Sequence, residues 1–245
     1  MRWRGRQQSD NVEDRRGMSP RMAMGGGGGL IAVLIVLALK FLGAPPQVQQ
    51  MAADLANQPR NVQPRNDQPA GAGVDDDHKK FIGVILKKTE EIWGQLFEEQ
   101  VSGGVYRQPK LVIYDGSTPT ACGTGQAAMG PFYCPADQMI YIDPSFFEDL
   151  AKRHRAPGDF AQAYVIAHEV AHHVQNLLGF SDAVNKVRMQ GDKRESNKAS
   201  VRLELQADFL AGVWAHHAHL QYDILEDGDI EEGIRAANQI AARNN

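Results

Sequence analysis

The stretch His168-Glu169-Val170-Ala171-His172 decides which fold and chemistry we expect around it. Residues four apart on a helix project from nearly the same face, one turn apart, so the two histidines can bind a single metal ion. Glu169 can reach a water molecule on that ion without binding the ion itself. This H-E-x-x-H spacing on a helix is typical of zinc hydrolases. We therefore predict His168 and His172 as metal ligands and Glu169 as the general base; a helix with two exposed histidines is the alternative.

The surrounding residues predict a helix over 159–178. A proline–glycine pair precedes Asp159, which is a typical capping residue. Apolar residues then recur every three or four positions up to Gly179, as in a helix with one buried face. These residues are Phe160, Tyr164, Ala167, Ala171, Val174 and Leu178. Each motif histidine follows an apolar position and should lie at the margin of the buried face, while His173 is expected to be a partly exposed polar residue.

A catalytic zinc ion usually has three protein ligands and one open position, so a third ligand is needed. Glu204 and Asp208 lie four apart in a second predicted helix, over 196–217. We predict that Glu204 completes the ligand set and that Asp208 accepts a hydrogen bond from a zinc-bound histidine. The alternative is an ordinary exposed acid pair. The two helices are expected to pack antiparallel, and one side of the second is predicted to be buried through Val201, Leu205, Phe209 and Val213.

These motifs resemble the gluzincin pattern, in which H-E-x-x-H is followed by E-x-x-x-D. The wider chain is similar to the bacterial putative neutral zinc metallopeptidase family, whose members are membrane-anchored. The similarity covers roughly 77–242 and rests on the segments Ala121-Cys122-Gly123, Gly130-Pro131-Phe132-Tyr133-Cys134-Pro135, Tyr141-Ile142-Asp143, His168 to Asn176, and Glu204-Leu205-Gln206-Ala207-Asp208.

The resemblance implies a zinc-dependent peptidase with one Zn²⁺ ion on His168, His172 and Glu204 and with Glu169 as base. It does not identify a substrate. Family members generally continue past the segment that matches residues 228–232, whereas this chain stops at Asn245. A C-terminal truncation is therefore part of the expectation.

The segment 22–44 is expected to be a transmembrane signal-anchor. It contains five glycines and then the apolar run from Leu30 to Leu39, and it is long enough to cross a hydrocarbon layer of ~30 Å. A cleaved signal peptide is the alternative, but two prolines follow Ala44 and no A-x-A site is present. Residues 1–21 hold six arginines and three acids, which predicts a cytoplasmic basic arm. The rest of this single-pass protein would then lie on the periplasmic or extracytoplasmic side of the cytoplasmic membrane.

Cys122 and Cys134 are the two cysteines of the chain, twelve residues apart in a glycine- and proline-rich stretch. In an exported domain such a pair predicts one disulfide. Zinc ligation and free buried thiols are the alternatives.

The remaining sequence predicts a flexible, disordered linker over 45–76 and one metallopeptidase domain over 77–245. Helical periodicity begins after three aspartates that end at Asp77, short strands are expected over 111–114 and 139–142, and a short helix over 145–154. The expected fold is α+β: a mainly helical, zincin-like domain with a small sheet. The strand over 139–142 offers a place for an extended substrate to pair.

The predicted function is hydrolysis of peptide bonds in a peptide or protein substrate by a zinc-activated water, with Glu169 taking the proton. A catalytically silent zinc-binding scaffold or envelope-assembly module is the alternative. The net charge of −4 makes nucleic acid an unexpected partner. No residue is predicted as a second oxyanion donor, since His216, His217, His219 and Tyr222 are expected at the surface. The sequence indicates no oligomeric state.

Overall fold

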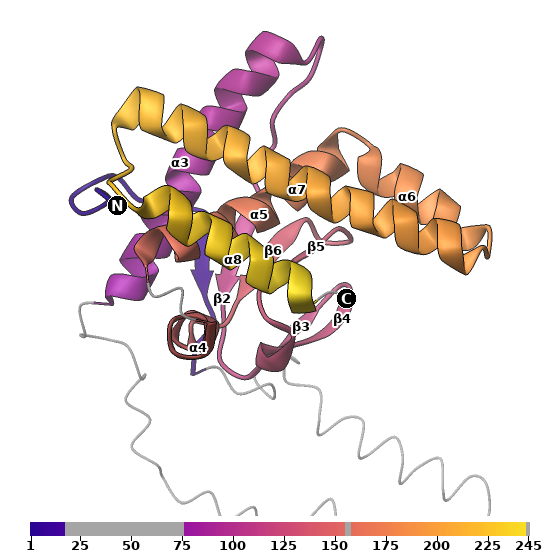
Figure 1. The fold of residues 1–245 in the computed structure, drawn as a ribbon, viewed down its shortest axis with the longest axis horizontal. Coiled ribbons are helices and arrows are strands. Elements are labelled where there is room, and N and C mark those ends of the chain that lie inside the picture. The colour runs from indigo at the N-terminus through magenta and orange to yellow at the C-terminus, as the bar shows by residue number, and fades with distance from the viewer. Residues whose placement is uncertain (18–75, 155–157, 244–245) are drawn as a thin grey trace, which may run out of the picture. The chain divides into compact units, whose positions relative to one another are not determined.

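The computed structural model of the chain describes residues 1–17, 76–154 and 158–243 (Figure 1). The predicted anchor over 22–44 and nearly all of the predicted linker over 45–76 lie outside these ranges. None of the helices within the described ranges is both long and apolar enough to span a membrane.

The main sheet has four short strands in the order β1-β2-β6-β5. The strands are β1 (Val12–Asp14), β2 (Lys110–Ile113), β6 (Met139–Ile142) and β5 (Phe132–Cys134). The first three run parallel, and β5 runs antiparallel to β6. A separate hairpin is formed by β3 (Ser117–Thr120) and β4 (Gly123–Gln126), followed by the 3-10 turn η1 (Ala127–Met129). The strand β5 is therefore an outer strand of the main sheet.

Both faces of the two central strands are covered. Side chains alternate between the faces of a strand, so Leu111 and Ile113 join the main core with the helices, whereas Val112 packs in a smaller cluster with Tyr141 and Cys134. The disulfide between Cys122 and Cys134 ties the hairpin region to β5 and confirms the predicted pairing.

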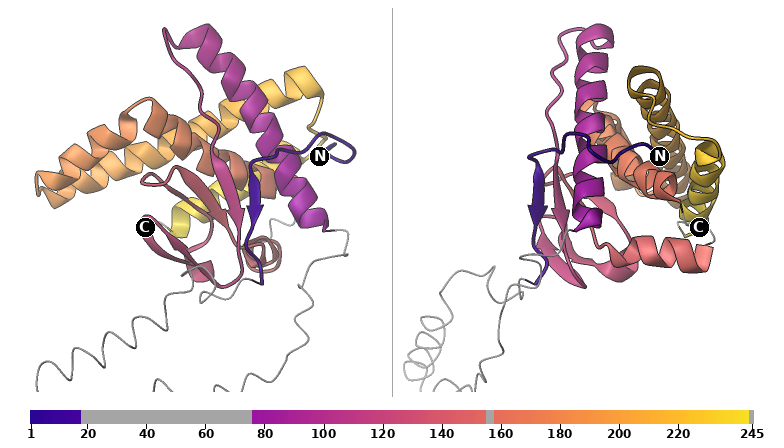
Figure 2. Two further views of the ribbon diagram at one scale, coloured as in Figure 1. Left: turned by 180° about the vertical axis from the view of Figure 1, so that it is seen from behind. Right: turned by 90° about the vertical axis from the view of Figure 1, so that its left-hand side faces the viewer.

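The helices α3, α5, α7 and α8 lie on one side of the sheet (Figure 2). The helix bounds are α3 (Asp77–Gln100), α4 (Ser145–His154), α5 (Asp159–Leu177), α6 (Phe180–Met189), α7 (Lys193–Tyr222) and α8 (Asp229–Arg243). Long apolar side chains of α3, α4 and α5 fill the core, which agrees with the periodicity of their sequences. The mixture of helices with a small sheet confirms the α+β expectation in its general form.

Residues 1–16 belong to the same compact unit as the domain, which differs from the separate basic arm predicted for 1–21. Trp3 is buried and packs edge-on against Phe81 of α3, with ring centroids 5.2 Å apart. The Met1 ammonium lies 2.8 Å from carboxylate oxygens of Asp159 and Glu226. The strand β1 has a single apolar residue in its three, so hydrophobic alternation did not reveal it.

The buried face of α7 is also not the predicted one. Val201, Leu205 and Phe209 are 50%, 62% and 68% exposed. The buried residues of the helix are instead mostly alanines, namely Ala207, Ala211, Trp214, Ala215 and Ala218. Small side chains let two helix backbones approach closely. The alanines therefore allow α7 to pack closely against the domain. The prediction chose the opposite face because the larger apolar residues lie there.

Candidate metal centre

The H-E-x-x-H motif lies in the buried middle of α5. His168 is 2% exposed and Glu169 is 7% exposed, because the apolar residues on both sides of them pack into the core. The ring centroids of His168 and His172 are 4.8 Å apart, as expected for side chains one helical turn apart.

The helix α7 brings Glu204 to these two histidines, as predicted. Its Oε2 lies 3.4 Å from Nε2 of His168 and 3.6 Å from Nε2 of His172. A tetrahedral zinc ion with bonds of roughly 2.0–2.1 Å holds its ligand atoms about 3.4 Å apart. One ligand atom from each of the three residues lies within 4.8 Å of the others. The donor set and its spacing therefore fit one zinc ion.

Hydrogen bonds on the far side of each imidazole hold its Nε2 toward this centre. Nδ1 of His168 lies 2.9 Å from Oδ1 of Asp208, and Nδ1 of His172 lies 2.9 Å from Oε1 of Gln175. Carboxylate and amide oxygens accept hydrogen bonds, so both Nδ1 atoms carry a proton, and Nε2 is the ring atom that can bind a metal once any proton on it is lost. The Tyr164 hydroxyl also donates to Asp208.

Gln175 is a residue whose role the sequence did not reveal. Its amide nitrogen donates to the Leu203 carbonyl at 2.7 Å and to Gln206 at 3.0 Å, which turns its oxygen toward His172. Its position three residues after His172 on the helix was the available signal. Gln175 thus links α7 to the second ligand, while Asp208 links α7 to the first.

The carboxylates make this centre attractive to a cation. Hydrogen bonds from His168 and His172 lower the pKa of Glu204 well below its usual range, against the opposing effect of burial. Burial lowers the pKa of His168, but the carboxylates of Asp208 and Glu204 outweigh it and raise the pKa to about 10. These residues therefore favour a positive charge at the point where the three candidate ligand atoms meet.

Glu169 lies beside the ligands and is not one of them. Burial raises the pKa of its carboxyl, while His172, His168 and a hydrogen bond from the backbone N–H of Tyr133 oppose the rise. A carboxylate with a raised proton affinity, close to a metal-bound water, is suited to act as a general base.

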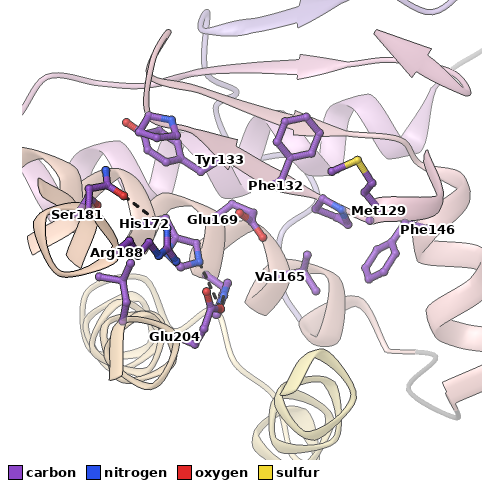
Figure 3. A pocket seen from close by; sticks show the side chains of 16 residues that line it. Met129, Phe132, Tyr133, Phe146, Val165, Glu169, His172, Ser181, Arg188 and Glu204 are labelled. Carbon is purple, nitrogen blue, oxygen red and sulfur yellow. Dashed lines mark hydrogen bonds and ion pairs between the residues drawn. The ribbon is translucent and has the colours of Figure 1, made fainter. Parts of the chain in front are cut away.

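The centre opens into a cavity of about 350 Å³ (Figure 3). Glu169 projects into it between two unlike ends. One end is apolar and is lined by Met129, Phe132, Phe146 and Val165. The other end, next to His172 and Glu204, is polar and is lined by Ser181, Asn185 and Arg188. The cavity can therefore accept an extended molecule with chemically different ends.

The chain's similarity to known proteins agrees with this geometry. The family described as "putative neutral zinc metallopeptidase" matches residues 1–244. The chain belongs to this family. The uncharacterized protein YpfJ of Escherichia coli K12 is 47% identical over 250 residues, which cover 98% of this chain and 83% of YpfJ. The uncharacterized protein Mb2605 of Mycobacterium bovis is 34% identical over 171 residues, which cover 66% of this chain and 56% of that protein. No solved structure matches the chain.

Other histidines of this metallopeptidase family member lie apart from the cavity. His216 and His219 are exposed, as predicted, whereas His217 and Tyr222 are partly buried; none of the four lines the cavity. The prediction for His173 is wrong, because its side chain is 1% exposed. His173 follows the second ligand directly, but its ring points to the other side of α5 and contacts Tyr106 and Tyr133.

Proposed function

We propose that this protein is a zinc-dependent peptidase that hydrolyses peptide bonds at the centre formed by α5 and α7. The observation that supports the proposal best is the meeting of Glu204 with His168 and His172 at a cavity, beside Glu169, which is not one of the three candidate ligands. A structural zinc site has four protein ligands and needs no base, whereas a hydrolytic site keeps one position open. Three metal-binding side chains with a neighbouring carboxylate match a hydrolytic site.

Each residue then has a defined task in hydrolysis. Zinc, when bound, supplies Lewis acidity that makes a water nucleophilic near neutral pH and polarises the substrate carbonyl. The Glu169 carboxylate takes the proton from the attacking water and passes it to the leaving amine nitrogen. Asp208 and Gln175 keep the two imidazoles oriented, so that their Nε2 atoms remain available as ligands.

The two ends of the cavity suggest which peptides fit. The apolar end accepts a large apolar side chain next to Glu169, and the Arg188 guanidinium at the other end favours an acidic side chain or a carboxylate. Pairing of substrate with the strand over 139–142 is not available, since β6 is bonded to β2 on one side and β5 on the other. We therefore propose that side-chain fit selects the substrate more than strand addition does.

The open side of β5 is also poorly equipped for strand addition. Alternate residues of an outer strand direct their N–H groups outward, and Tyr133 is the middle residue of β5. Pro131 and Pro135, two positions away on either side, have no N–H to offer.

The disulfide supports a location for the domain outside the cytoplasm, because such bonds persist in oxidising compartments. Membrane attachment through the segment 22–44 remains our proposal for how the domain is held there.

The substitution Glu169→Gln tests the function. We expect it to retain zinc, measured by elemental analysis, and to lose at least about 100-fold in hydrolysis of quenched-fluorescent casein. Glu98→Gln is the matched control at an exposed position of α3 and should behave like the parent. Equal activity of parent and Glu169→Gln would reject the peptidase, and zinc binding without any hydrolysis by the parent would favour a silent scaffold.

A further inference from the structure

The side of α7 that faces away from α5 carries exposed apolar side chains. Val201, Leu205 and Phe209 recur every four residues and are exposed, whereas the buried side of the helix consists mostly of alanines. Figure 2 shows α7 on the side of α5 that is farther from the sheet, so this stripe belongs to the surface of the domain. A continuous apolar stripe on a surface helix indicates a place where another molecule binds.

Basic side chains accompany the apolar stripe. Arg194, Lys198 and Arg202 also recur every four residues of α7 and are exposed. Successive residues of a helix are rotated by roughly 100°, so these cations and the apolar residues project within one arc of roughly 100°. We call this arc the outer face of α7, and its residues are Arg194, Lys198, Val201, Arg202, Leu205 and Phe209.

The outer face begins in a basic part of an acidic chain. Residues 186–202 hold six lysines and arginines and two acids, whereas the whole chain has a net charge of −4. Within α7, all of which the structure describes, Glu195 is the only exposed acid, and it pairs with Lys198 at 2.7 Å. The charge of the outer face is therefore complementary to an anionic surface.

Apolar and cationic side chains together on one exposed helix are suited to a layer of anionic lipids. Leucine and phenylalanine enter the boundary of the acyl chains, while the long side chains of lysine and arginine reach the phosphate groups. A helical peptide would need a groove, whereas the outer face is the convex side of a single helix. Each lysine or arginine near an anionic lipid surface strengthens binding about fivefold.

We propose that the outer face of α7 docks the domain on a membrane surface that contains anionic lipids. The proposal goes beyond the peptidase function and uses residues of the described domain alone. Glu204 lies three and seven residues before Ala207 and Ala211, so it projects from the buried side of α7 and lines the cavity from there. A membrane on the outer face therefore leaves the cavity open to a substrate.

The test detects lipid contact at the outer face itself. The full-length chain with Leu205→Cys carries an environment-sensitive fluorophore on the introduced thiol, since the native cysteines form the disulfide. The vesicles contain phosphatidylcholine with or without phosphatidylglycerol, and a lipid that is spin-labelled in its acyl chain. We expect the spin label to quench the fluorophore in the anionic vesicles and not in the neutral ones. The fluorophore reports contact at its own position, so attachment through the segment 22–44 alone does not produce this signal.

Two controls separate the outer face from other surfaces. The same fluorophore on Val105→Cys, an exposed apolar position before β2, should stay unquenched in both kinds of vesicle. Arg194→Glu combined with Arg202→Glu should raise the concentration of anionic vesicles needed for half-maximal quenching at position 205 at least about 10-fold. Arg107→Glu combined with Lys110→Glu changes the net charge equally at exposed positions outside α7 and should match the parent.

The proposal is overturned if the fluorophore at position 205 is not quenched, or is quenched equally in neutral and anionic vesicles. Quenching that charge reversal on α7 leaves unchanged would also overturn it. A blue shift without vesicles that grows with protein concentration would assign the outer face to a second copy of the chain instead. None of these measurements needs turnover, so a failure of the proposed peptidase function leaves the result on membrane docking intact.

Discussion

At the residue scale, the geometry of the centre depends on acceptors behind the histidines. Asp208 receives hydrogen bonds from both His168 and Tyr164, so one carboxylate holds two residues of α5 against α7. Partners of this kind fix the tautomer and the direction of a ligand ring, and their loss typically lowers metal affinity 10–100-fold.

Asp208→Ala should therefore lower the affinity for zinc about 10–100-fold, because His168 loses the acceptor that orients its ring. The affinity is measured by competition with a chromophoric chelator. Glu195→Ala removes an exposed carboxylate near the start of the same helix and should bind zinc like the parent. Parent-like affinity in Asp208→Ala would show that the ring is held by packing alone.

The sequence was sufficient to group the proposed ligands because they follow a local helical rule. Spacings of four residues identified His168 with His172 and also indicated Glu204 with Asp208, and the structure brings these residues together. His173 was mistaken for a partly exposed residue because its partners, Arg107 and Tyr133, come from segments distant in sequence. A single sequence contains no sign of which neighbours will enclose a polar side chain.

At the scale of elements, the prediction succeeded where a long hydrophobic period was present. The helices α4 and α5 follow their predicted ranges closely, and α3 begins where helical periodicity was predicted to begin. The strands β1, β3 and β4 are three or four residues long and are mostly polar or contain glycine or proline, so alternation could not identify them. The strand β5 is apolar, but its three residues are too few to show alternation.

The prediction of which face of α7 is buried was wrong, and two substitutions test the face that the structure buries. Leu205→Ser should change the free energy of unfolding by no more than about 0.5 kcal/mol, because Leu205 is 62% exposed. Trp214→Ala should cost about 3–5 kcal/mol, because Trp214 is fully buried among the helices. Urea denaturation of both variants checks the assignment. A large loss in Leu205→Ser would show that the side predicted from the sequence is buried after all.

At the scale of the whole molecule, the position of residues 1–16 limits how the chain can sit in a membrane. The strand β1 pairs directly with β2 of the metal domain. The sequence predicts a cytoplasmic arm over 1–21, one crossing over 22–44 and an external domain. One crossing over 22–44 would put β1 and β2 on opposite sides of a bilayer. The β1–β2 pairing and a single crossing therefore cannot exist in the same molecule.

Thiol labelling can decide between the β1–β2 pairing and a single membrane crossing. The two native cysteines are joined in the disulfide, so an introduced cysteine supplies the reactive thiol. We expect Asp10→Cys and Gln100→Cys, both at exposed positions, to react alike with a membrane-impermeant maleimide on spheroplasts. Labelling of Gln100→Cys in intact spheroplasts, with Asp10→Cys labelled only after lysis, would instead support the single crossing and show that β1 does not pair in the cell.

The bond between the Arg16 guanidinium and the Asp76 carboxylate places the end of the first described segment next to the start of the second. For protein engineering, Arg16 and Asp76 are therefore close enough to be joined by a short glycine–serine bridge in place of residues 18–75. The shortened chain should give a compact domain for crystallisation. A fragment that simply begins at Asp76 would lose Trp3 and leave one edge of β2 unpaired, and an unpaired strand edge invites self-association.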